Sequence, residues 1–163
     1  MRWFRFAVLI LVVTVLQKGL LARLHTKPDL LIVFLVFFAV YCNTSDAIIT
    51  SFVTGFAADL VGSPMPMGPH MVSFCLFGTL LAYLHRIVSI RRMPHQVMAI
   101  FATGTLAAAL AHFLAYLLKG EPVSANIYSV ILVTALYSSI VGPFLFLPSA
   151  WWMGIKIDRF RRR

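Results

Sequence analysis

The chain has 163 residues, of which 61% are hydrophobic and 12% are charged. Soluble globular proteins are about 45–50% apolar, so this composition excludes an ordinary soluble domain and indicates a single membrane domain. The 14 Lys and Arg residues give a net charge of +9, but they stand in short clusters beside apolar runs, which favours contact with anionic lipids over nucleic acid.

The first predicted helix runs over about residues 3–21, between basic residues whose long side chains can reach the membrane interface. It resembles a secretory signal, but no small-residue cleavage site precedes a soluble domain, so we expect it to stay as a membrane anchor. The second helix is predicted over 29–42, with Pro28 in its first turn and Asp29 at the positive end of its dipole. The polar run 43–46 favours a turn that ends this helix.

A third helix is predicted over 47–61, which is short for a full crossing and fits either a tilted span or a locally thin bilayer. Gly and Pro between Gly62 and Pro69 predict a loop. Further helices are predicted over 71–88, over 95–118 with an alanine-rich packing face, and over 127–152 with kinks at two prolines.

These segments predict an all-α polytopic bundle of about six transmembrane helices, with both ends on one side of the membrane. Ten Lys and Arg residues fall on that side and four on the other, so the positive-inside rule predicts that both ends are cytoplasmic. The basic tail 153–163 should lie on the inner lipid surface, through Lys156, Arg159, Arg161, Arg162 and Arg163.

Asp59 is the most informative polar residue, because an ionised carboxylate near the end of an apolar segment must face protein, water or the interface. It fits either a proton or ligand site or, as we favour, a carboxylate that bonds loop amides or a neighbouring helix. A proton relay from Asp59 to His112 is the functional alternative. Cys42 and Cys75 fit small buried apolar residues.

No nucleophile with a neighbouring base, no phosphate-binding loop and no metal-ligand spacing stands out, so we predict no enzymatic activity, cofactor or metal. Small residues instead recur at helical spacing on the third and fourth segments, where they let helix backbones approach. We expect these positions to serve helix packing or partner contact: Gly55, Ala58, Asp59, Gly62, Gly78 and Ala82.

Three motifs in a fixed order resemble the bacterial rod shape-determining proteins of the MreD family. They are Pro28–Leu31 at the start of the second segment, Gly55–Gly62 running into the turn Pro66–Gly68, and Phe77–Gly78. The resemblance implies a non-enzymatic inner-membrane component of the cell-elongation machinery. Such a protein binds MreC and helps couple MreB filaments to peptidoglycan synthases.

The same resemblance leaves a second interpretation open, because the family is similar in fold to the vitamin-binding membrane subunits of energy-coupling-factor transporters. In that case Asn43, Asp46, Asp59 and His70 would lie near one ligand pocket. For the shape-determining role, we expect the helix of MreC to pack in a groove lined by the small residues of the third to fifth segments.

Overall fold

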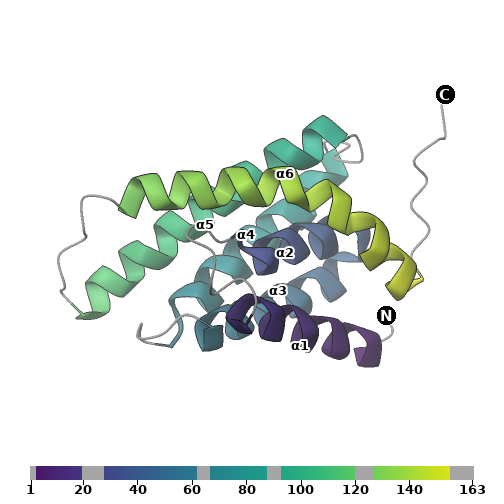
Figure 1. Cartoon of the computed structure of the whole chain (residues 1–163), viewed down its shortest axis with the longest axis horizontal. Helices are drawn as coiled ribbons and strands as arrows, with labels where there is room; N and C mark the ends of the chain where they lie inside the picture. The colour runs from purple at the N-terminus through teal and green to yellow at the C-terminus, as the bar shows by residue number, and fades with distance from the viewer. Residues whose placement is uncertain (1–2, 20–27, 62–66, 88–92, 120–126, 155–163) are drawn as a thin grey trace.

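The computed structural model describes residues 3–19, 28–61, 67–87, 93–119 and 127–154. These residues form an all-helical bundle in which the long α5 and α6 lie side by side across the shorter helices (Figure 1). Among them, α6 and residues 94–118 of α5 are long and apolar enough to cross a membrane. The helices are α1 (Trp3–Gly19), α2 (Leu30–Tyr41), α3 (Thr44–Val61), α4 (Pro69–Ile87), α5 (Met93–Lys119) and α6 (Ile127–Met153).

The short helix α2 is the centre of the bundle. Every residue from Leu31 to Val40 is buried, and each of the other five helices contacts α2. A helix that is apolar on all sides requires such surroundings. Phe37 of α2 packs against Phe146 of α6 with ring centroids 5.4 Å apart. With 12 residues, α2 is about 18 Å long, well below the roughly 30 Å of a hydrocarbon core.

Asp29 begins α2 and joins it to two other helices. Its Oδ1 accepts from the backbone N–H of Leu31 at 3.0 Å and of Ile32 at 3.4 Å, so Asp29 is the N-cap. Oδ1 also accepts from Nε2 of Gln17 on α1 at 3.0 Å, and the Asp29 N–H donates to Oγ of Ser138 on α6 at 2.7 Å. The prediction that Pro28 lies in the first turn is wrong, because Pro28 precedes this cap.

Three helices begin earlier than the sequence predicted, and two of them, α3 and α4, do so at residues that favour turns and helix starts alike. The polar residues Thr44 to Asp46, predicted as a turn, form the first turn of α3, where an acidic side chain complements the helix dipole. α3 therefore has 18 residues and is about 27 Å long. α4 begins at Pro69, predicted as loop, because proline has no N–H to leave unpaired in a first turn.

Both cysteines are free and half-buried rather than fully buried. Cys42 follows the last residue of α2, outside the helices, and its backbone N–H donates to the carbonyl of Phe38. Burial, and then the nearby Asp46 carboxylate, raises the pKa of the Cys42 thiol to about 11. The thiol therefore stays protonated at neutral pH, which makes it a poor nucleophile.

Candidate functional site in the hairpin of α3 and α4

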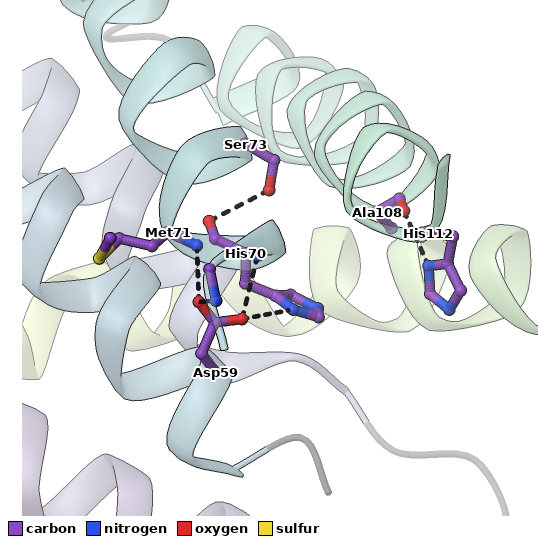
Figure 2. Close-up of polar contacts among 7 residues, drawn as sticks. Asp59, His70, Met71, Ser73, Ala108 and His112 are labelled. Atoms are coloured by element: carbon purple, nitrogen blue, oxygen red, sulfur yellow. Dashed lines mark hydrogen bonds and ion pairs between the residues drawn. The ribbon is translucent and has the colours of Figure 1, made fainter. Parts of the chain in front are cut away.

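The carboxylate of Asp59, near the end of α3, caps the start of α4. Oδ2 accepts from the backbone N–H of Gly68 at 2.9 Å and of Met71 at 3.0 Å, and Oδ1 accepts from that of His70 at 3.0 Å (Figure 2). Pro69 has no N–H to offer. One side chain from the preceding helix therefore satisfies the amides that the first turn of α4 would leave unpaired.

The imidazole of His70 completes this arrangement. Its Nδ1 lies 3.1 Å from Oδ1 of Asp59, and the side chain of Asp59 is only 2% exposed. Because a carboxylate only accepts hydrogen bonds, Nδ1 carries the proton in this contact. Two donors on each oxygen fill the roughly four acceptor positions of the carboxylate. Asp59 is thus a buried, fully bonded carboxylate. This agrees with the interpretation favoured from the sequence, in which it bonds loop amides or a neighbouring helix.

His112 does not take part in this network. Its Nδ1 lies 2.8 Å from the carbonyl oxygen of Ala108, one turn earlier in α5, and Figure 2 shows His112 apart from Asp59. Within the described residues no hydrogen bond links the two side chains. With the acceptor positions of Asp59 occupied, the geometry gives no support to a relay between them.

Glycines set the close approach of α3 and α4 below the cap. A methyl group on Gly55 would lie 2.7 Å from Cα of Met71 and 2.9 Å from the carbonyl oxygen of His70. A methyl group on Gly78 would overlap Oγ of Ser51 and lie 2.7 Å from its Cβ. Cβ atoms do not reach such distances, so both positions need glycine: Gly55 packs against the backbone of α4, and Gly78 packs against the side chain of Ser51 on α3.

Most of the small residues that the sequence singled out lie inside the bundle. Gly55, Ala58, Gly78 and Ala82 are all buried, and Gly55 and Gly78 face the partner helix of the hairpin. They do not form an open groove. Gly62 and the basic tail residues Lys156, Arg159, Arg161, Arg162 and Arg163 lie outside the described residues.

The open groove of the hairpin lies instead on its outer surface, and the sequence analysis missed it. It has a volume of about 740 Å³ and is lined by apolar side chains of α4 together with Phe52 of α3. Val72, Leu76 and Leu80 form one exposed row on α4, Phe52 of α3 is also exposed, and the smaller Cys75 and Thr79 lie in the row of α4 beside the first. The spacing Cys75-x-x-x-Thr79 is the only signal in the sequence that points to this surface.

The family comparison covers almost the whole chain. Residues 1–154 match the family described as rod shape-determining protein MreD. The chain belongs to the MreD family. The resemblance drawn from the motifs is therefore confirmed, and with it a polytopic, non-enzymatic membrane protein with a role in rod-shape determination. No curated protein and no solved structure matches the chain.

The four polar residues expected near a vitamin pocket do not come together in this MreD-family chain. Asn43 and Asp46 lie at the start of α3, whereas Asp59 lies near its other end and bonds to His70. Asp59 lies 13 positions after Asp46, which corresponds to about 20 Å of helix. One small-molecule site cannot contain all four side chains.

Proposed function

We propose that this chain is a six-span, N-in and C-in component of the bacterial inner membrane that binds MreC. Through MreC it helps couple MreB filaments to peptidoglycan synthesis. The family match over residues 1–154 carries this proposal. The bonded state of Asp59 supports it, because that carboxylate is used within the fold rather than offered to a substrate.

Two observations support the orientation. Arg5 Nη1 donates to the carbonyl oxygen of Trp152 at 3.0 Å, and Trp152 Nε1 donates to that of Arg5 at 3.2 Å. The start of α1 and the end of α6 are therefore neighbours, which supports the placement of both chain ends on one side of the membrane. The excess of Lys and Arg on that side favours the cytoplasm.

The outer groove of the α3–α4 hairpin is our proposed contact surface for the transmembrane helix of MreC. Helices associate in membranes through close packing at small residues, and Cys75 and Thr79 provide a small-residue stripe beside larger exposed side chains. Gly55, Ala58, Gly78 and Ala82 contribute indirectly, because they hold α3 against α4 and so shape this groove. Replacing these glycines would damage the fold and the contact together.

A groove-filling variant tests the contact without disturbing the core. We expect Thr79→Trp to reduce MreC co-purifying with the tagged chain from its native host in mild detergent by about tenfold. That factor corresponds to about 1.4 kcal/mol, within the cost of one poorly fitting interface residue. Leu106→Trp is the matched control, because Leu106 is an exposed apolar residue of α5 that is 53% exposed and away from the groove.

The cells should show the same difference. We expect Thr79→Trp to give rounded cells and Leu106→Trp to give rods when each replaces the native chain. Normal MreC recovery with Thr79→Trp would exclude the groove as the contact. Rod-shaped cells after depletion of the whole chain, with an ATPase-linked transport module in the eluate, would overturn the proposed function itself.

A further inference from the structure

The antiparallel helices α1 and α6 are joined at two levels. At one level Arg5 and Trp152 exchange hydrogen bonds, and in Figure 1 the end of α6 bends toward the start of α1. At the other level Gln17 bonds to Asp29, and the Asp29 N–H donates to Ser138. Gln17 lies 12 positions after Arg5, which corresponds to about 18 Å of helix.

An apolar cleft with a volume of about 410 Å³ lies between these two levels. Leu30 and Phe34 of α2 line it together with residues of α1 and α6, and Ser149 is among its few polar residues. The Ser149 hydroxyl donates to the carbonyl oxygen of Leu145 in its own helix, so it offers no proton to a ligand. Val12 and Leu16 at the rim are 47% and 41% exposed.

These dimensions fit one hydrocarbon chain. A single leaflet contributes half of the roughly 30 Å hydrocarbon core, about 15 Å, which is close to the length of α1 between the two bonded levels. Its volume falls within the roughly 300–1,000 Å³ of cavities that hold small ligands. The exposed rim of the cleft lies on the side of the helix bundle. A lipid of the surrounding bilayer would enter from that side.

The charge at the Arg5 level favours an anionic headgroup. The described residues give the Arg5 side chain one hydrogen bond, from Nη1 to a carbonyl, and no acidic partner. A guanidinium has five N–H donors, and a phosphate accepts two of them in parallel. Trp151 and Trp152 stand beside it, 85% and 46% exposed, as aromatic residues do at the level of headgroups.

We infer that this cleft is a binding site for a membrane phospholipid with an anionic headgroup, with one acyl chain between α1 and α6 and the phosphate at Arg5. In the proposed orientation the lipid belongs to the inner leaflet. The site shares no lining residue with the proposed MreC contact, which lies on α3 and α4, so either proposal can fail alone.

Photolabelling of the full chain in lipid nanodiscs tests the site. The nanodiscs are made of unlabelled phosphatidylcholine with a small fraction of a probe lipid that carries a diazirine in one acyl chain. The probe lipid is phosphatidylglycerol in one sample and phosphatidylcholine in the other. We expect phosphatidylglycerol to label peptides with Val12 and Leu145 roughly five times more than phosphatidylcholine does, the factor that one basic residue supplies at an anionic surface. Labelling at Val72 and Leu76 on α4 should show no such preference.

Three variants separate the headgroup from the acyl chain. Arg5→Gln should remove the preference for phosphatidylglycerol and leave some labelling by both lipids, whereas Lys18→Gln, at the other end of α1, should keep it. Val12→Trp should fill the cleft and reduce labelling by both lipids. Thermal unfolding midpoints near that of the native chain identify variants that keep the fold.

Equal labelling of the cleft by the two lipids, or an Arg5→Gln variant that keeps the preference, would overturn the anionic site. Labelling that spreads evenly over all outward faces of the bundle would overturn the cleft as a site of any kind.

Discussion

The hairpin of α3 and α4 and the pair of α1 and α6 are both antiparallel, but they are held together in opposite ways. α3 and α4 pack along their length, with Gly55 against the backbone of α4 and Gly78 against the side chain of Ser51 on α3. α1 is joined to α6 directly at Arg5 and Trp152 and, through Asp29, at Ser138 in the middle of α6, and a cleft lies between these two levels. Close packing stabilises a pair of membrane helices, whereas a pair joined only at two levels leaves space for something else.

The largest loss of stability should come from disturbing the closest contact between α3 and α4, at Gly78. Gly78→Ala places a methyl group against Oγ and Cβ of Ser51, and we expect it to cost about 1–3 kcal/mol, the usual penalty for overpacking. Gly104→Ala is the matched control, because its methyl group would meet Ala135 and Ile32 at 3.5 Å, ordinary contact distance. Thermal unfolding in detergent should show a lower midpoint for Gly78→Ala alone.

A second substitution should restore the packing. Ser51→Gly removes the two closest atoms that the new methyl group meets and leaves only Leu35 Cδ1 at 3.0 Å, so in the Gly78→Ala background it should recover part of the lost stability. If Gly78→Ala and Gly104→Ala have the same thermal unfolding midpoint, α3 and α4 do not pack closely at Gly78.

The cap of the same hairpin should have the next largest effect. Asp59→Asn replaces one accepting oxygen by an NH₂ group that faces backbone donors, and we expect a loss of about 1–3 kcal/mol. Amide hydrogen exchange should accelerate at Gly68, His70 and Met71, which donate to this carboxylate. Asp46→Asn, in the first turn of α3, is the control and should leave those amides unchanged.

Unchanged exchange in Asp59→Asn would mean that other groups cap α4. A loss of cell shape with normal stability and normal exchange would instead point to a direct functional role for the carboxylate.

The contrast between the two regions also explains what the sequence could and could not predict. The positions of six helices followed from apolar runs and their Pro and Gly borders. The central place of α2 did not, because lipid and protein interior are both apolar, so the sides of a membrane helix that face them look alike in sequence. The phenylalanines within Leu31–Val40 are all buried, whereas Phe144 of α6 is 72% exposed, so the residue type alone does not tell the two situations apart.

The contacts of the candidate sites could be predicted in part from the sequence. Asp59 had to face a polar partner, and its partners Gly68 to Met71 lie only 9–12 residues away, in the Pro and Gly turn that the sequence marks. The cleft could not be predicted from the sequence, because Arg5 and Trp152 are 147 positions apart and no local pattern relates them. The start of α3 was misjudged because Thr, Ser and Asp favour turns and helix starts equally.

The smallest effect should come from the end bonds of α1 and α6. Trp152→Phe keeps the ring but removes the N–H that donates to the carbonyl of Arg5, at a cost of about 0.5–1.5 kcal/mol. Trp151→Phe is the matched control, because Trp151 is 85% exposed and its ring makes no such bond. Since the Gln17, Asp29 and Ser138 bonds remain, the bundle should stay folded while hydrogen exchange rises in the first turns of α1 only. Equal exchange in both variants would mean that the cleft is closed by packing rather than by this bond, and that its width does not depend on the tryptophan.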